Sequence, residues 1–372
     1  MRLFIKEVRR LLQWRMWLLF LPIAAILYVM NIEFHFQHFP NGSDAYYYET
    51  AENLVHEYGV EVTDANMAEF AEHHEQQLVA ADAFIANHPK ANALNVSTYD
   101  EVFASAIDER EMRDLRNTLM DSADGLFWFI QMERSILDQY RSDTEHPSYT
   151  AAANERITEG NARGEHQAIL PAQVMDNFHS LLFNGSMLVL VAIVVFISPA
   201  FYRDHHVRPL QYVTKKGRRV FSLKLWAALF VGLLLTTLIL GSLFAGYVVL
   251  NDTTLFWEAS INSFMSPAFF WYGLSFQAYM LVSGAIVYSI VVLMVIVTSI
   301  VSRFAGSYLS LLGLLVPGTL LFIIFALQDI TSFLFIVTDA ATLPFFVSGA
   351  ALLLAAILFM YRTRREARME IV

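Results

Sequence analysis

The densest group of charged side chains is basic and lies in the stretch YVTKKGRRVFSLK, residues 212–224. It places five Lys and Arg residues in thirteen positions of a chain whose formal net charge is −10. Cationic side chains at this density bind nucleic-acid phosphates, lipid headgroups or an acidic protein surface. The positions of the other charges decide among these partners.

Motifs for catalysis or metal binding are absent from the sequence. It has no cysteine, no GxxxxGK[ST] loop for ATP and no HExxH spacing. His73 and His74 would point about 100° apart on a helix, so we interpret them as solvated surface residues instead of metal ligands. Carboxylates in the predicted external loops come without a nucleophile or a set of metal ligands: Asp252, Glu258, Asp329 and Asp339. We therefore expect neither an enzyme nor a metal or cofactor site.

The composition indicates a membrane protein. The chain is 56% hydrophobic and 16% charged, with a mean hydropathy of +0.44, which exceeds the range of ordinary soluble domains. Apolar runs of about twenty residues cross a ~30 Å hydrocarbon core as helices. We predict an all-α polytopic membrane protein with six transmembrane helices, at residues 17–32, 179–202, 222–250, 278–302, 307–327 and 344–361.

The basic residues predict the topology. Seventeen of the 25 Lys and Arg lie before the first predicted span, in 203–224, at Arg303 or in the tail 362–372, whereas the loops 251–277 and 328–343 contain none. This distribution follows the positive-inside rule and predicts cytoplasmic termini, in a bacterial plasma membrane. The basic stretch then lies at the cytoplasmic surface. Nucleic-acid binding is disfavoured, because no basic domain or base-stacking platform accompanies it.

The N-terminus is expected to be a retained signal anchor. Residues 1–16 predict an amphipathic helix in the cytoplasmic headgroup layer, with Arg9 and Arg10 on its polar face. The alternative is that these residues merely extend the first span.

Residues 33–178 predict a helical extracytoplasmic domain inserted between the first two spans. It carries 27 acidic and eight basic residues. Its acidic surface either attracts cationic peptides or ions, or only keeps the domain soluble. Asp64 is expected to begin a helix that ends near His88 and Pro89, and Met112, Leu115 and Leu119 recur at helical spacing. Gly160 and Gly164 are expected in loops.

The predicted spans have no ionisable residue in their central portions, which disfavours an ion-coupled carrier. Their glycines are interpreted as positions of close helix packing, with a polar transport path as the alternative: Gly232, Gly241, Gly246, Gly284 and Gly313. The segment 328–343 is expected to be re-entrant or interfacial, since it is apolar but too short to cross.

Residues 198–224 resemble the intracellular loop of ABC-2-type permeases. Asp204 stands where that family commonly has Glu after the second span, and Leu210, Tyr212 and Val213 form an apolar face before the turn 214–218. Lys224 follows Arg218 by six positions, as in the family, whereas Arg208-Pro209 replaces its usual small pair. The interfacial helix, six spans and insertion after the first span agree in layout.

The resemblance implies the transmembrane subunit of an exporter for an amphipathic, peptide, lipid or drug-like substrate. The implied partners are a separate ATPase subunit, which binds ATP and Mg²⁺, and a second permease copy in a homodimer or related heterodimer. In the predicted coupling segment, residues 203–221, ATPase contact is assigned to Asp204, Arg208, Leu210, Tyr212, Val213, Thr214, Lys215 and Lys216. Membrane-surface anchoring is assigned to Arg9, Arg10, Arg218, Arg219 and Lys224.

A membrane-anchored sensor with an extracytoplasmic ligand-binding domain is the alternative function. Sensors usually carry a recognisable cytoplasmic output domain, and the longest predicted internal segment is only about twenty residues. An ATP-binding cassette ATPase gene beside this one would favour the permease.

Overall fold

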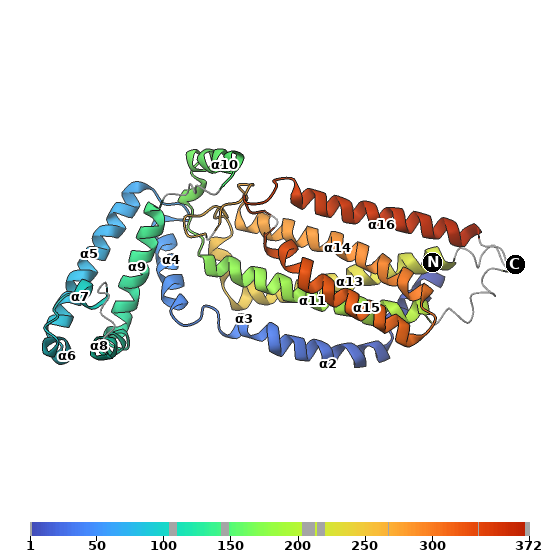
Figure 1. Ribbon diagram of the computed structural model, residues 1–372, viewed down its shortest axis with the longest axis horizontal. Helices are drawn as coiled ribbons and strands as arrows, with labels where there is room; N and C mark the ends of the chain where they lie inside the picture. The colour runs from blue at the N-terminus through green and yellow to red at the C-terminus, as the bar shows by residue number, and fades with distance from the viewer. Residues whose placement is uncertain are drawn as a thin grey trace. The chain divides into compact units, whose positions relative to one another are not determined.

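The computed structural model describes residues 2–103, 110–142, 149–202, 213, 220–266, 268–333 and 335–368. In these ranges the chain is helical, and strand-like pairing is limited to the isolated bridges Glu61–Ala168 and Ser260–Ser275. Six of the described helices are long and apolar enough to cross a membrane. The predicted all-α class and its six apolar helices are therefore confirmed (Figure 1).

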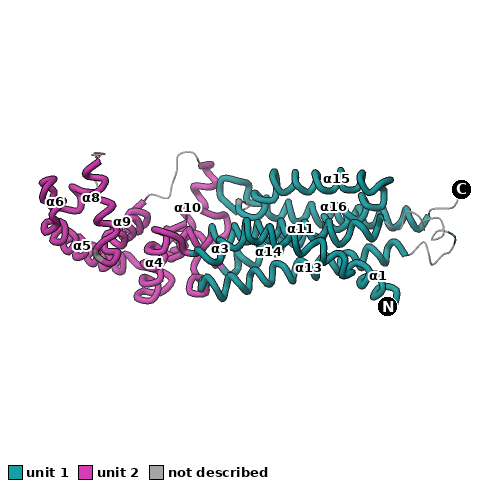
Figure 2. The backbone as a smooth tube through the Cα atoms, turned by 90° about the horizontal axis from the view of Figure 1, so that it is seen from below, with its two compact units in different colours: residues 1–39, 176–253, 277–372 teal, residues 40–175, 254–276 magenta. Residues whose placement is uncertain are grey.

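The chain divides into two compact units (Figure 2). Unit 1 comprises residues 1–39, 176–253 and 277–372 and holds the six apolar helices. Unit 2 comprises residues 40–175 and 254–276, so most of the predicted external loop 251–277 belongs to the same unit as the predicted inserted domain.

In unit 1 the long helices run side by side (Figures 1 and 2). Its helices are α1 (Arg2–Leu11), α2 (Trp14–Asn31), α3 (Glu33–Gln37), α11 (Ala172–Tyr202), α13 (Val220–Leu250), α14 (Phe276–Phe304), α15 (Tyr308–Phe322) and α16 (Leu343–Arg368). In the most apolar 18-residue stretch of α11, 72% of the residues are buried, whereas in that of the first span only 6% are buried. Thus α11 is the central helix, and α2 lies at the periphery.

The N-terminal residues form a helix separate from the first span. Gln13 has an extended backbone (φ −61°, ψ 142°) between α1 and α2, which interrupts the helical hydrogen bonding. Helix α1 packs on α13, where the rings of Phe4 and Phe230 lie 5.9 Å apart, edge to face. The break separates α1 from α2, although Arg2–Asn31 together form one apolar stretch long enough to cross a membrane.

Two helices extend beyond their predicted ends. After α15, wider π-helical turns at Ile323–Leu327 and Asp329–Phe333 continue the helix, so the first part of the predicted segment 328–343 is helical. The helix α16 continues to Arg368, past the predicted end of the sixth span at residue 361. Its last turns carry Arg362 and Glu366, which are buried.

Unit 2 is built from shorter helices around its own core. They are α4 (Asp44–Tyr58), α5 (Asp64–Ala86), α6 (Pro89–Ala93), α7 (Tyr99–Phe103), α8 (Arg110–Met120), α9 (Leu126–Arg141) and α10 (Ala151–Ala162). Helices α5 to α9 supply the core, which includes Met112, Leu115 and Leu119; their predicted helical spacing is confirmed by α8.

The predicted ends of α5 are also confirmed. Thr63 and Asn66 form a capping box: the Thr63 hydroxyl accepts from the Asn66 amide at 3.3 Å, and the Asn66 side chain accepts from the Thr63 amide at 3.0 Å. These bonds satisfy amides that a helix leaves unpaired at its first turn. The helix ends at Ala86, just before His88 and Pro89.

One predicted loop glycine lies inside a helix. Gly164 follows α10 with φ +76°, as expected of a glycine in a turn, whereas Gly160 is within α10. A Cβ at Gly160 would lie 2.5 Å from the Phe269 ring. The sequence-based interpretation of Gly160 is wrong, because the residue serves close packing and not chain reversal.

Candidate functional site

Most of the predicted coupling segment lies outside the described residues, including Asp204, Arg208, Leu210, Tyr212, Thr214, Lys215, Lys216, Arg218 and Arg219. Val213 is described and its side chain is 64% exposed. The helices that flank the segment are described as well: α11 ends at Tyr202 and α13 begins at Val220.

The two flanking helices meet through an aromatic pair. The rings of Phe201, near the end of α11, and Phe221, in the first turn of α13, lie 6.0 Å apart in an edge-to-face arrangement. Both side chains are buried, with 1% and 2% exposure. The two ends of the segment are therefore held together by a packed contact in unit 1.

Beside Phe221 lies a group of three buried charged residues, Arg303, Arg362 and Glu366, which we call the charged cluster. Arg303, at the end of α14, donates from Nε and Nη2 to the two Glu366 oxygens at 3.2 and 2.9 Å. Arg362 donates from Nη2 to Glu366 Oε1 at 2.8 Å. The Phe221 ring centre lies 5.1 Å from Arg303 Cζ and 5.9 Å from Arg362 Cζ.

The charged cluster ties three helix ends together. It joins the start of α13 to the ends of α14 and α16, and its three charged side chains are at most 2% exposed. A buried ion pair holds its geometry tightly, since losing one partner leaves an uncompensated charge. Sequence reasoning missed the cluster; the available signal was an acidic residue four positions after Arg362 in an otherwise basic tail.

Lys224 contacts a neighbouring helix. Its side chain is 7% exposed, and its Nζ lies 3.9 Å from Glu7 Oε2 of α1. The structure thus adds a contact between α1 and α13, and the anchoring role of Lys224 stays a prediction. Arg9 is exposed and Arg10 is half-buried, 3.6 Å from Glu7.

The glycines of the spans have two different roles. A Cβ at Gly232 would lie 2.4 Å from Val295, and one at Gly246 would lie 3.3 Å from the Phe36 ring, which confirms close packing there. At Gly241, Gly284 and Gly313 no atom of the described part of the chain lies within 4 Å of a Cβ position. Close packing within the single chain is therefore not observed at these three glycines.

Gly241 and Gly284 line an apolar cleft of about 510 Å³ among α11, α13 and α14. Its walls include aromatic side chains such as Phe178, Phe244 and Tyr288. The Tyr288 hydroxyl lies 2.7 Å from that of Thr237, while Thr236 and Ser299 donate to carbonyls in their own helices. This chemistry suits an apolar or amphipathic molecule more than an ion.

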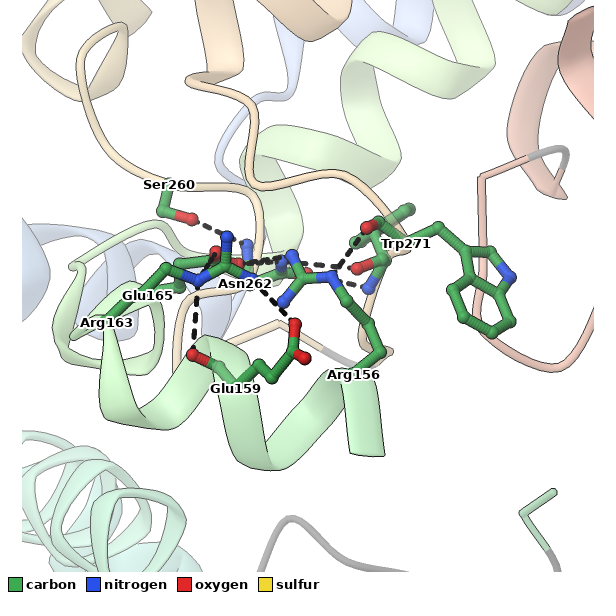
Figure 3. Close-up of polar contacts among 8 residues, drawn as sticks. Arg156, Glu159, Arg163, Glu165, Ser260, Asn262 and Trp271 are labelled. Atoms are coloured by element: carbon green, nitrogen blue, oxygen red, sulfur yellow. Dashed lines mark hydrogen bonds and ion pairs between the residues drawn. The ribbon is translucent and has the colours of Figure 1, made fainter. Parts of the chain in front are cut away.

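In unit 2 a buried network joins α10 to the loop before α14 (Figure 3). Arg156 donates from Nη2 to Glu165 at 2.6 Å and from Nε to the Trp271 carbonyl at 2.6 Å. Asn262 donates to the same Glu165 oxygen at 2.7 Å. A Cβ at Gly273 would lie 2.5 Å from Glu165. These contacts make residues 254–276 an integral part of unit 2.

Unit 2 also contains a polar cavity of about 540 Å³ bordered by α4, α5 and α9. Its lining includes the carboxylates of Glu57, Glu69, Glu72 and Glu133. Burial, followed by the nearby Glu57 and Glu69 charges, raises the pKa of Tyr58 to about 12. The electrostatic field at this cavity favours cations.

His73 lines this cavity, and it differs from its neighbour His74. His73 has 55% of its side chain exposed, but His74 is buried, and its Nδ1 lies 3.1 Å from Glu133 Oε2. The interpretation of both as solvated residues is therefore wrong for His74. Within the described residues, no group of three His, Cys, Asp or Glu has metal-binding geometry.

A comparison with known protein families, curated proteins and solved structures found no match for this chain.

Proposed function

We propose that this chain is the transmembrane permease subunit of an ATP-binding cassette exporter. It works as a dimer, with itself or with a related permease, in a cell membrane with both termini cytoplasmic. ATP and Mg²⁺ bind to a separate ATPase subunit, and this chain contributes no catalytic residue. The cargo is an amphipathic molecule of the peptide, lipid or drug-like class.

The observation that carries the proposal is the packing at the ends of the coupling segment. Phe201 and Phe221 bring α11 and α13 into contact, and Phe221 lies against Arg303 and Arg362 of the charged cluster. Because packed helices move as rigid bodies, a displacement of the segment passes into α11, α13, α14 and α16 together. An ATPase that pulls on this segment would thereby move four spans.

Within the segment, the apolar and basic residues have separate roles. Leu210, Tyr212 and Val213 dock into the ATPase, and the 64% exposure of Val213 leaves it available for such a contact. Asp204, Arg208, Thr214, Lys215 and Lys216 surround that face. Arg218 and Arg219 contact lipid headgroups.

The cleft lined by Gly241 and Gly284 is the proposed cargo site. Apolar walls in which Tyr247 and Tyr288 are the side chains with a polar group favour a molecule that hides a long apolar surface and presents few polar groups. Closure of α11, α13 and α14 around the cleft would expel the bound molecule.

The proposal is tested by changing Leu210, Tyr212 and Val213 together to Ser, and separately Lys215 and Lys216 to Gln. Each apolar side chain buried in a docked contact contributes about 1.5–3 kcal/mol, whereas an exposed ion pair contributes ~0–1 kcal/mol. The triple variant should reach the membrane but lose the co-expressed ATPase in a pull-down, and the double variant should retain it.

Retention of the ATPase by the triple variant together with its loss in the double variant would reverse this division of roles. The chain alone in sealed vesicles should neither hydrolyse ATP nor move cargo under a proton gradient. Transport by the isolated chain would rule out the permease proposal.

A membrane-anchored receptor is the second candidate, and the cation-favouring cavity of unit 2 is the observation that supports it. If the chain is a receptor, a cationic peptide should protect unit 2 from proteolysis, and no cassette ATPase should co-purify with the chain. A permease predicts a cassette ATPase in the purified complex.

A further inference from the structure

A second apolar depression lies in unit 1, bounded by α1, α13 and α16. We call it the α13 groove; it has a volume of about 870 Å³, and its lining includes Phe4, Trp226, Phe230, Leu233 and Arg364. It is separate from the proposed cargo cleft, with which it shares no lining residue. The Trp226 and Phe230 side chains are 56% and 49% exposed, so the groove is open to its surroundings.

The length of the α13 groove corresponds to one leaflet of a bilayer. Its α13 wall runs from Ser222 to Leu233, which is about 16 Å at the helical rise per residue. Half of a ~30 Å hydrocarbon core is about 15 Å. An extended acyl chain would therefore be covered along the thickness of a single leaflet.

The polar groups of the α13 groove lie at the end where α16 closes it. Arg364 is there with Ser222 and Thr363, and the Thr363 hydroxyl already donates to the Phe359 carbonyl at 2.8 Å. The elements around this end are strongly basic: α1 and α16 each carry four Lys or Arg and one Glu. This charge attracts an anionic headgroup.

We propose that the α13 groove is a binding site for an anionic phospholipid of the leaflet that surrounds α1. One acyl chain lies along Trp226, Phe230 and Leu233, and the phosphate pairs with Arg364. A second copy of this chain is a poorer occupant, because a symmetric contact would bring two sets of basic residues from α1 and α16 together. The inference goes beyond the proposed transport function and requires no ATPase.

The test is native mass spectrometry of the purified full chain with phosphatidylglycerol and phosphatidylethanolamine of identical acyl chains. The parent should retain phosphatidylglycerol preferentially. Arg364→Gln should lower that preference about fivefold, the effect of one basic residue at a membrane surface. Leu233→Trp fills the apolar part and should reduce adducts of both lipids.

Arg365→Gln is the matched control, since Arg365 is exposed on the same turn of α16 but does not line the α13 groove. An equal loss of preference in Arg364→Gln and Arg365→Gln would show only diffuse surface charge and overturn the site. Trp226→Ala is the second groove variant should Leu233→Trp fail to fold, because it removes a largely exposed side chain.

Disulfide crosslinking in the membrane tests whether a second copy of the chain covers the α13 groove. The chain has no cysteine, so Trp226→Cys introduces a single thiol into the α13 groove. We expect no disulfide-linked dimer to form through this thiol under oxidation. A disulfide-linked dimer in high yield would show that a second copy covers this face and would overturn the lipid assignment.

Discussion

Arg303 and Glu366 lie 63 positions apart in the sequence and form a two-point ion pair with N–O distances of 3.2 and 2.9 Å. Both side chains are only 1% exposed. Arg362 shares the same carboxylate from the preceding turn of α16, so both guanidinium groups pair with Glu366.

Removing this carboxylate should destabilise unit 1. Glu366→Ala removes the carboxylate with which both buried arginines pair, and we expect the free energy of unfolding to fall by about 3–5 kcal/mol. The measurement is thermal unfolding of the purified chain in detergent. Arg365→Ala is the control because it removes an exposed side chain from the same turn. Equal midpoints for the two variants would contradict a structural role for the charged cluster.

Two glycines of α13 should respond oppositely to the same substitution. A methyl group at Gly232 meets Val295 at 2.4 Å, and Val295 is completely buried, so Gly232→Ala should cost about 1–3 kcal/mol of stability through overpacking. Gly241→Ala enters open space and should not destabilise the helix, since Ala is the better helix former. Unfolding midpoints of the two variants check this pair. Similar losses in both would mean that α13 does not pack on α14 as described.

The stability of unit 2 should depend on pH through His166. Burial lowers the pKa of His166 below its ordinary value of 6.5, so near that pH the unfolded chain binds more protons than the folded chain. The contribution of neutral His166 to the free energy of unfolding is therefore fully present above about pH 6.5. It is lost as the pH falls toward the lowered pKa of His166.

The measurement is the unfolding midpoint at about pH 7.5 and about pH 5.5. His166→Gln should narrow the difference between the two midpoints, and His56→Gln, which changes an exposed histidine, should leave it as in the parent. An unchanged difference in His166→Gln would assign the pH dependence to other groups.

The topology is tested with single cysteines, which the Cys-free chain accepts without background. In intact cells an impermeant thiol reagent should label Asn95→Cys and Glu145→Cys but not Lys216→Cys or Arg364→Cys, because the basic segments are expected inside. Permeabilised cells provide the control that the last two thiols react at all. Labelling of Lys216→Cys from outside would invert the orientation and remove the basis for ATPase contact.

The sequence by itself determined the fold class and the apolar helices. Composition and run length suffice for this, because each span satisfies its own backbone hydrogen bonds and needs only enough apolar residues to cross. Local signals also located the ends of α5 and the buried face around Leu115, since capping and helical periodicity act between residues a few positions apart.

Only the tertiary structure decided which side chains meet across long stretches of chain. The sequence could not pair Arg303 with Glu366, or Arg156 with the loop that contains Asn262, because such contacts depend on how distant helices pack. For the same reason it could not separate the packed Gly232 from the open Gly241, or the buried His74 from the exposed His73. Neighbouring residues of one type acquire different roles through the surfaces that their helix turns toward the rest of the protein.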